Sequence, residues 1–218
     1  MNESELKETL RRHGQEQVLR WWEELGSDAR AELARQVGQI EWDKLSLSAE
    51  DGRRGAIAPI EGLSVAEIAA RKEEYFAIGR DAVRAGKAAA VLLAGGQGTR
   101  LGSDAPKGTY DIGLTRPLYI FEQLVRNLQE VTSACGASIP LLIMTSEKND
   151  CETREFFEKH DCFGYPREDI FFFRQAMAPC MDLEGKILLE DKGRIALSPN
   201  GNGGWYSSLV KAGLAEAM

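Results

Sequence analysis

The sequence lacks the residues and patterns that mark several large classes of protein. It has two histidines, His13 and His160, and four cysteines, none of which form a CxxC pair. A structural zinc site is therefore not expected, and the cysteines are expected to be free thiols in a reducing cytoplasm. No segment approaches the roughly 20 apolar residues that a membrane span requires. The charged start from Met1 to Lys7 also lacks the apolar core of a signal peptide.

Positive charge is scarce as well. The chain has 27 Lys and Arg against 34 Asp and Glu, a net charge of −7, and no basic patch of the kind that nucleic-acid-binding proteins show. The 43% apolar and 28% charged residues are ordinary for a globular protein, and 218 residues suffice for one large domain or for a core domain with a subdomain. We therefore expect neither a nucleic-acid nor a membrane partner. The sequence says nothing about the oligomeric state.

The first part of the chain carries helical patterns. Apolar residues recur at helical spacing over residues 3–42, and Ser27-Asp28 is expected to cap the second of two helices. Residues 46–62, rich in Ser, Gly and Pro, read as a connecting loop. Ser64 and Glu67 then have the spacing of a capping box, which predicts a helix that runs to about Ala85 with Gly86 after its end; the domain prediction is a helical N-terminal region over residues 1–86.

Residues 87–218 alternate between strand and helix patterns and are expected to form a nucleotide-binding α/β domain. Such alternation is typical of a parallel sheet with crossover helices, which binds ligands at the carboxyl ends of its strands. The last helix stops at Met218 without a cap, and three core strands are few, so we expect this domain to be incomplete at its C-terminus and the chain to be the front part of a longer protein. The expected strands cover residues 88–94, 139–145 and 170–173, with a hairpin from residues 186–189 and 194–197; the expected helices begin at Thr115-Arg116-Pro117, cover residues 149–160, and begin at about Trp205.

A glycine-rich loop follows the first expected strand. It contains Gly95, Gly96 and Gly98, then Arg100, and then Pro106-Lys107-Gly108. Glycine lets the main chain approach a ligand and offers amide N–H groups to it, and two fixed cations nearby supply the charge that a polyphosphate needs. The loop therefore predicts a nucleoside triphosphate site.

Two better-known phosphate motifs do not fit this loop. The third glycine of a GxGxxG dinucleotide fingerprint would fall at Leu101, and no Gly-Lys-Ser/Thr sequence of a P-loop is present. A tight turn that binds nothing would leave Arg100 and Lys107 without an explanation.

The loop, from Leu93-Ala94-Gly95-Gly96 through Thr99-Arg100-Leu101-Gly102 to Pro106-Lys107-Gly108, resembles the signature of the nucleotidyltransferases that make nucleotide sugars. Among them the chain is most similar to the UDP-sugar pyrophosphorylases (UDPGP type 1 family), in the UDP-N-acetylglucosamine pyrophosphorylase branch that Arg100 favours. Gln175 and residues 199–204 mark the uridylyl-transferring branch, although the family often has Asp where this chain has Asn200. Further segments that match lie at residues 143–146, 155–164, 172–175 and 186–190.

The resemblance implies a Rossmann-like nucleotide-diphospho-sugar transferase sheet with an N-terminal helical extension. It also implies roles for the residues that match. Main-chain groups of Leu93, Ala94, Gly95 and Gly96 would contact uracil and ribose, and Gln175 would pair with the uracil edge. Gly98, Thr99 and Arg100 would hold the β- and γ-phosphates, Lys107 would reach the α-phosphate, and Gly201 and Asn202 would face the nucleotide or the sugar. Solvent-facing positions for Gln175 and Lys107, and a simple turn and helix cap at residues 200–204, stay open as alternatives.

The implied reaction joins UTP to a sugar 1-phosphate, with N-acetylglucosamine 1-phosphate first in order, and releases pyrophosphate with the help of Mg²⁺. A metal-binding residue cannot be placed in this sequence: Asp104 and Asp111 lie near the loop, but nothing in the family pattern makes them ligands. Two alternatives remain. The chain could be a truncated, non-catalytic module that binds UTP or a UDP-sugar, or a UTP–glucose-1-phosphate uridylyltransferase.

Overall fold

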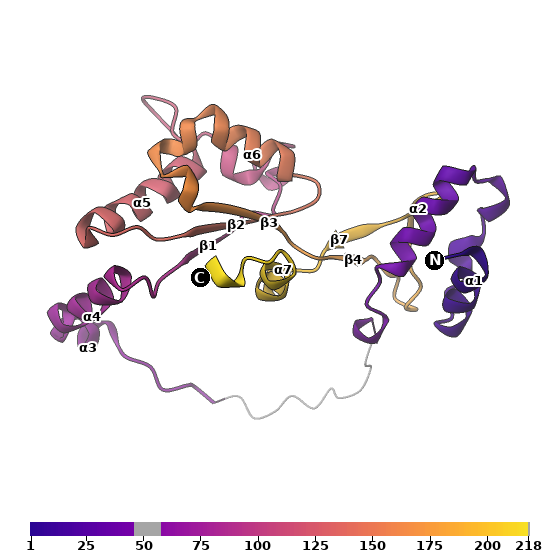
Figure 1. Cartoon of the computed structure of the whole chain (residues 1–218), viewed down its shortest axis with the longest axis horizontal. Coiled ribbons are helices and arrows are strands. Elements are labelled where there is room, and N and C mark those ends of the chain that lie inside the picture. The colour runs from indigo at the N-terminus through magenta and orange to yellow at the C-terminus, as the bar shows by residue number, and fades with distance from the viewer. Residues whose placement is uncertain (46–57, 218) are drawn as a thin grey trace. The chain divides into compact units, whose positions relative to one another are not determined.

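A computed structural model describes residues 1–45 and 58–217 of the chain, so most of the predicted loop at residues 46–62 lies outside the described residues. The chain divides into two compact units, which are described separately below (Figure 1). The sequence predicts a domain boundary between residues 86 and 87. That boundary separates domains along the chain, not compact units in space, and it stays a prediction. The first unit comprises residues 1–59 and 177–198, and the second comprises residues 60–176 and 199–218.

The first unit packs a pair of helices against short antiparallel strands. Strand β5 pairs with β6, and β4 pairs with β7, so the hairpin predicted from the sequence is confirmed with shifted bounds. Its shared core joins residues far apart in the chain, because Leu6 and Leu33 lie in one buried cluster with Ile187 and Ile195. The elements are α1 (Glu3–Arg12), η1 (Glu16–Leu19), η2 (Trp22–Glu24), α2 (Ser27–Gly38), η3 (Trp42–Lys44), β4 (Met177–Pro179), β5 (Leu189–Asp191), β6 (Arg194–Ile195) and β7 (Leu197–Pro199).

The start of α2 differs from the prediction. Gly26, in an extended conformation, is the N-cap residue, and no side chain caps the helix. The Ser27 hydroxyl instead donates to the Asp28 carboxylate at 3.2 Å, inside the first turn. The predicted Ser27-Asp28 cap is therefore wrong, because the helix begins one residue earlier than the polar pair requires.

The second unit is built on a parallel sheet in the order β1-β2-β3. Leu142 of β2 pairs with Val91 of β1 and with Phe171 of β3. This arrangement confirms the α/β sheet that the alternating pattern predicts. The elements are α3 (Val65–Ala70), α4 (Lys72–Arg84), β1 (Ala90–Leu93), η4 (Thr99–Leu101), η5 (Lys107–Thr109), α5 (Ile120–Cys135), β2 (Leu141–Thr145), α6 (Asp150–Lys159), η6 (Asp161–Gly164), η7 (Arg167–Asp169), β3 (Ile170–Arg174), η8 (Asn202–Gly204), α7 (Trp205–Lys211) and η9 (Ala215–Ala217).

Strand β2 is buried along its whole length because helices cover both faces of the sheet. Alternate side chains of a strand point to opposite faces. Leu141 and Ile143 therefore join a cluster with aromatic residues of α5 and α6, whereas Leu142 and Met144 join a second cluster with Leu209 of α7. Figure 1 shows α5 and α6 on one side of the strands and α7 on the other. The sheet is thus the middle layer of a three-layer unit.

The helix predicted from the capping box starts as expected. The Glu67 amide donates to the Ser64 hydroxyl at 3.2 Å, and the Ser64 amide donates to the Glu67 carboxylate at 2.7 Å. Gly86 follows the end of α4 with a φ of +67°, as the sequence predicts. The single helix expected up to Ala85 is broken at Arg71, however, and no glycine or proline marks that break.

Helix α5 begins later than the sequence predicts. Its N-cap is Tyr119, whose main-chain amide donates to the Glu122 carboxylate at 3.5 Å. The Asp111 carboxylate accepts hydrogen bonds from the amides of Gly113 at 2.8 Å and Leu118 at 2.9 Å. These bonds fix residues 111–118 as a loop, so the helix cannot start at Thr115. Its end at Gly136 is confirmed by the left-handed conformation of that glycine.

Candidate functional site

The glycine loop lies at the carboxyl ends of the parallel strands in the second unit. After β1 the chain makes an antiparallel bridge with itself, between Gln97 and Pro106. The Gly98 amide donates to the Ala105 carbonyl at 2.9 Å, and the Lys107 amide donates to the Gly96 carbonyl at 3.2 Å. The two motifs that the sequence singles out, the glycines and the Pro-Lys-Gly segment, are therefore adjacent in the fold.

Gly98 has a different part in this loop from the one expected for it. Its amide is bonded to Ala105, so that N–H group is not available to a phosphate. A Cβ atom at this position would lie 3.2 Å from the Ala105 carbonyl oxygen and from the Ser103 side chain. Gly98 thus allows two parts of the loop to approach each other closely. Thr99, the next residue, is exposed at the start of η4, and the Arg100 side chain lies outside the described part of the structure.

Lys107 stands on a rigid turn. Its side chain is exposed, and among the described residues no carboxylate lies within ion-pair distance of it. The next residue, Gly108, is buried flat against the ring of Phe121, because a Cβ atom there would lie 2.1 Å from two ring carbons. The turn therefore fixes the main chain of Lys107 while its ammonium group stays free of competing anions.

Gln175 lies directly after β3 and packs on the glycine loop. Its side chain is 7% exposed, and a Cβ atom at Gly95 would lie 2.1 Å from its amide nitrogen. The Gln175 main-chain amide donates to the Thr145 carbonyl at 2.8 Å, which holds the residue at the end of the sheet. Within the described residues the side-chain amide has no hydrogen-bond partner. Neither amide atom is among the buried side-chain atoms that lack a hydrogen-bond partner, so the donor and the acceptor stay accessible at the surface and are available to a ligand.

Leu93 and Ala94 end the first strand beside this amide. Leu93 is 41% exposed at the last position of β1, and the Ala94 amide donates to the Met144 carbonyl at 2.7 Å, extending the ladder by one bond. The main chain of these residues is therefore held by β2 up to the point at which the glycines begin. The structure brings them together with Gly95, Gly96 and Gln175 at one end of the sheet.

The glycine-rich segment before α7 lies close to the same place. The Asn200 amide donates to the Ala176 carbonyl at 3.0 Å, and the Ala176 amide donates to the Ser208 hydroxyl of α7 at 3.1 Å. Gly201 then has a φ of +78°, a conformation that suits glycine, and Asn202 opens η8 with an exposed side chain. The hydrogen bond between Asn200 and Ala176 therefore holds Gly201 and Asn202 close to Gln175.

Asn149 is a polar residue of this site that the sequence does not single out. It is fully buried, and its side-chain nitrogen donates to the Ala94 carbonyl at 2.9 Å and to the Gly96 carbonyl at 3.4 Å. Its side-chain oxygen accepts from the Ser146 amide at 2.8 Å. The signal for it is local: an asparagine three residues after a serine, between a buried strand and a helix.

Two arginines with exposed side chains form ion pairs with the buried carboxylate of Asp150 and support the ends of β2 and β3. Asp150 accepts hydrogen bonds from the Thr145 hydroxyl at 2.6 Å, from Arg154 at 3.0 Å and from Arg174 at 2.8 Å. Burial raises the pKa of this carboxyl, but the hydrogen bonds from Thr145, Arg174 and Arg154 outweigh burial and hold the pKa below its ordinary value. The cluster therefore joins Arg174, the residue before Gln175, to the first turn of α6.

We expect Asp150→Asn to lower the free energy of unfolding by about 2 kcal/mol at pH 7, since it weakens charge-assisted hydrogen bonds. The folded-state pKa is lowered, so the carboxylate stabilises the fold above the unfolded-state pKa of about 3.9, and this contribution is lost as the pH falls through the folded-state pKa. Urea denaturation at pH 7 and near pH 3 should show a difference between variant and parent that shrinks in acid. A difference independent of pH would contradict this role.

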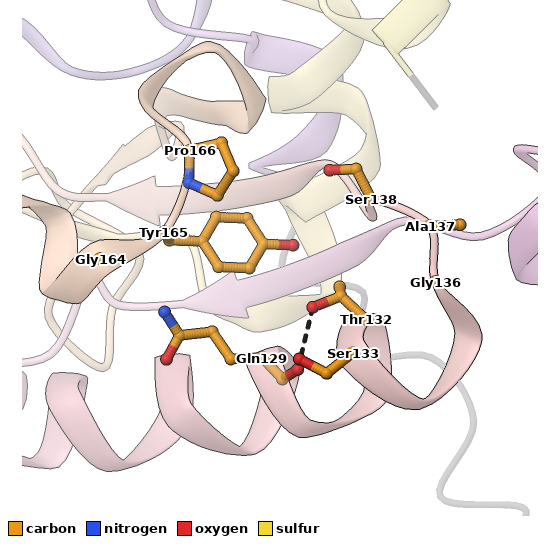
Figure 2. A pocket seen from close by; sticks show the side chains of 9 residues that line it. All are labelled: Gln129, Thr132, Ser133, Gly136, Ala137, Ser138, Gly164, Tyr165 and Pro166. Carbon is orange, nitrogen blue, oxygen red and sulfur yellow. Dashed lines mark hydrogen bonds between the residues drawn. The ribbon is translucent and has the colours of Figure 1, made fainter.

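A separate hollow lies at the amino ends of the strands, at the other end of the sheet from the glycine loop. It has a volume of ≈ 680 Å³, and no charged residue lines it (Figure 2). Figure 2 shows Gln129 of α5 facing the segment that begins at Gly164, and the Gln129 side chain donates to the Phe163 carbonyl at 3.1 Å. None of the residues predicted to bind the nucleotide borders this hollow.

No group of three or more His, Cys, Asp or Glu side chains in the described ranges could hold a metal ion. The four cysteines are free thiols, as the sequence predicts. Within residues 1–45 and 58–217, no helix has both the length and the apolar character needed to span a membrane.

Comparisons with known proteins agree on one family. A family model described as UTP–glucose-1-phosphate uridylyltransferase matches residues 30–218. UDP-N-acetylglucosamine pyrophosphorylase of Saccharomyces cerevisiae is 35% identical over an alignment that covers 93% of this chain. UDP-N-acetylglucosamine diphosphorylase 2 of Arabidopsis thaliana is 33% identical over 98% of this chain. The chain spans about half the length of these relatives, 47% of each.

A solved structure shows the same similarity in three dimensions. The crystal structure of the uridine diphosphate N-acetylglucosamine pyrophosphorylase from Trypanosoma brucei in complex with inhibitor superposes with a TM-score of 0.69 at 32% identity. The superposition covers 93% of this chain and 44% of that chain. The similarity therefore extends over the helical N-terminal region as well as the sheet.

Proposed function

Because the chain belongs to the UTP–glucose-1-phosphate uridylyltransferase family, we propose that it binds UTP and serves the transfer of a uridylyl group to a sugar 1-phosphate. One observation carries this proposal. The end of the sheet presents the accessible amide of a largely buried Gln175 on Gly95, beside a loop that brings Lys107 to the glycines. An amide that can pair with a base and a free cation on the same loop suit a nucleotide with a phosphate tail.

N-acetylglucosamine 1-phosphate is the proposed acceptor. The relatives from yeast and Arabidopsis carry the name of that sugar, and Arg100 in the loop favours the same branch of the family. Glucose 1-phosphate is the second candidate because the family model is described by that substrate.

The proposed reaction needs positioning more than it needs an acid or a base. An oxygen of the sugar phosphate, already an anion near neutral pH, forms a bond to the α-phosphorus of UTP. The bond from that phosphorus to the bridging oxygen breaks, and pyrophosphate leaves with the electron pair. Two anions must approach each other, so fixed cations and oriented amides supply the catalysis. Lys107 is the proposed contact of the α-phosphate, where charge builds up.

The other residues hold the nucleotide. Main-chain groups from Leu93 to Gly96 are the proposed contacts of uracil and ribose, and Gln175 is the proposed partner of the uracil edge, since a side-chain amide offers both a donor and an acceptor. Thr99 and Arg100 are the proposed contacts of the β- and γ-phosphates. Gly98 shapes the loop through its bond to Ala105, and Gly201 and Asn202 are proposed to face the nucleotide or the sugar.

Mg²⁺ is the proposed metal because a triphosphate offers it the oxygen ligands that it prefers. The described residues provide no cluster of side chains for it, so the proposal gives it no protein ligand. The four free thiols support a cytoplasmic location, which remains part of the proposal.

Titration of the purified chain with UTP and a pyrophosphate-release assay test the proposal. Micromolar UTP binding together with turnover of N-acetylglucosamine 1-phosphate is the expected result. Glucose, N-acetylgalactosamine and N-acetylglucosamine 1-phosphates compared at equal concentration identify the acceptor. Binding without turnover would reduce the chain to a nucleotide-binding module, and no binding of UTP would refute the proposal.

We expect Gln175→Leu to lower the preference for UTP over CTP by about tenfold, or about 1.4 kcal/mol, because leucine keeps the volume but removes both hydrogen-bonding groups. Dissociation constants for UTP and CTP, measured on parent and variant, give this ratio directly. An unchanged ratio would show that Gln175 does not read the base, whatever happens to overall affinity.

A further inference from the structure

Asn149 lies where it can control the glycine loop. It occupies the junction between β2 and α6, is fully buried, and holds the Ala94 and Gly96 carbonyls with one side-chain nitrogen, at 2.9 and 3.4 Å. Its oxygen is engaged by the Ser146 amide at 2.8 Å, which fixes the orientation of the side chain. The side-chain oxygen of Asn149 is thus fixed by Ser146, and the side-chain nitrogen points at the glycine loop.

The contacts of Asn149 determine which way two peptide groups face. No peptide bond in the described chain is cis, and in a trans peptide the carbonyl of one residue and the N–H of the next point in opposite directions. Because the Ala94 and Gly96 carbonyls point at Asn149, the N–H groups of Gly95 and Gln97 point away from it. No described residue accepts a hydrogen bond from either N–H group. Two free donors therefore project from the opposite side of the loop.

The same contacts reach Lys107. The Gly96 carbonyl that receives the Asn149 amide also receives the Lys107 main-chain amide, at 3.2 Å. One carbonyl oxygen therefore links α6, the glycine loop and the turn that carries the cation. A change at Asn149 would alter the orientation of this shared acceptor and with it the position of Lys107.

We infer that Asn149 is a positioning residue for nucleotide binding, which turns the Gly95 and Gln97 amides and the Lys107 turn toward UTP. The inference rests on the proposed function and adds to it a residue that touches no substrate. Successive main-chain N–H groups that face the same way form a favourable site for anionic or carbonyl oxygens. Burial of the donor strengthens its hold on the loop, since water cannot compete for the two carbonyls.

The test compares two replacements of Asn149 in the whole chain. Asn149→Ser keeps an oxygen for the Ser146 amide but is too short to reach the loop, whereas Asn149→Asp keeps the size and replaces the donor nitrogen by a carboxylate oxygen. Calorimetric titration with UTP should show a dissociation constant raised about tenfold for both variants at pH 8. Two-dimensional ¹H–¹⁵N NMR should show UTP-induced shifts of the Gly95 and Gln97 amides in the parent and much smaller shifts in the variants.

Proton uptake gives a signature that a purely structural role would not produce. The carboxyl introduced by Asn149→Asp is buried against two carbonyls, so its pKa is expected to rise, and its protonated form can again donate to the loop. The ratio of variant to parent dissociation constants should therefore fall as the pH is lowered from 8 to 5, whereas the ratio for Asn149→Ser should stay constant.

Gln129→Ala is the matched control, since Gln129 also donates a side-chain amide to a loop carbonyl, at the other end of the same sheet (Figure 2). Its UTP affinity should equal that of the parent even if its melting temperature falls as much as that of Asn149→Ser. Parental affinity in both Asn149 variants would overturn the inference and leave the proposed function intact. A parent chain that does not bind UTP would refute the proposed function, and the inference with it.

Discussion

Lys107→Ala is expected to raise the dissociation constant for UTP by about tenfold to a hundredfold while the fold stays intact. The size follows from the loss of a charge-assisted contact, which is worth about 1.5–3 kcal/mol. The Lys107 side chain is exposed and has no ion pair among the described residues, so its removal breaks no stabilising contact. In a protein that turns over, the loss should be about a hundredfold or more in rate, because negative charge builds up at the α-phosphate in the transition state.

Lys87→Ala is a suitable control for that experiment. Lys87 is also an exposed lysine of the second unit, but it precedes β1 and so lies at the opposite end of that strand from the glycine loop. Both variants change the net charge by the same amount, so a general electrostatic effect would weaken UTP binding equally. Calorimetric titration should show a loss for Lys107→Ala alone, and equal losses would refute a specific contact.

Gly108→Ala is expected to destabilise the chain and to weaken UTP binding at the same time. The added methyl group would overlap the Phe121 ring, which is 2% exposed and cannot move without disturbing the cluster under α5. Overpacking of this kind costs about 1–3 kcal/mol. The turn that carries Lys107 must shift to relieve the overlap, so the ammonium group leaves its position. Thermal unfolding and UTP titration of one protein sample measure both effects.

A second-site change distinguishes this collision from a general effect of alanine. Phe121→Leu opens space at the contact, so the double variant should regain part of the UTP affinity lost in Gly108→Ala, and the two changes should not be additive. Gly79→Ala is the control for the substitution itself, because Gly79 lies in α4 with no atom near its missing side chain. We expect it to stabilise the helix by about 0.5–1 kcal/mol. A loss of affinity in Gly79→Ala would undermine the argument.

The sequence predicts the parts of the fold that local patterns determine. Apolar runs of strand length predict β1, β2 and β3, and the Ser64–Glu67 spacing and the glycines at 86 and 136 predict helix ends that the structure confirms. The sequence places the start of α5 too early because the Asp111 bond to the Leu118 amide spans seven residues, and a helical pattern gives no sign of such a loop.

The sequence likewise predicts some residues of the candidate site and misses others. The glycines and Lys107 are visible in the sequence because they lie in one loop, but the bond that takes the Gly98 amide out of use depends on how that loop closes onto Ala105. Asn149 was missed because the carbonyls it holds are 53 and 55 residues away in the chain. No single-sequence pattern reports a contact across that separation, although the residue type and its place after a strand are typical of a loop-holding amide.

The order in which the first unit can form during protein synthesis follows from its discontinuous core. Leu6 and Leu33 pack with Ile187 and Ile195, and the Gln15 and Gln36 side chains accept hydrogen bonds from the amides of those two isoleucines. A ribosome makes the helices first and releases their partners only some 150 residues later, about ten seconds or more at usual elongation rates. Throughout that interval the nascent helices expose their apolar faces, so a chaperone that shields such faces would act on this end of the polypeptide.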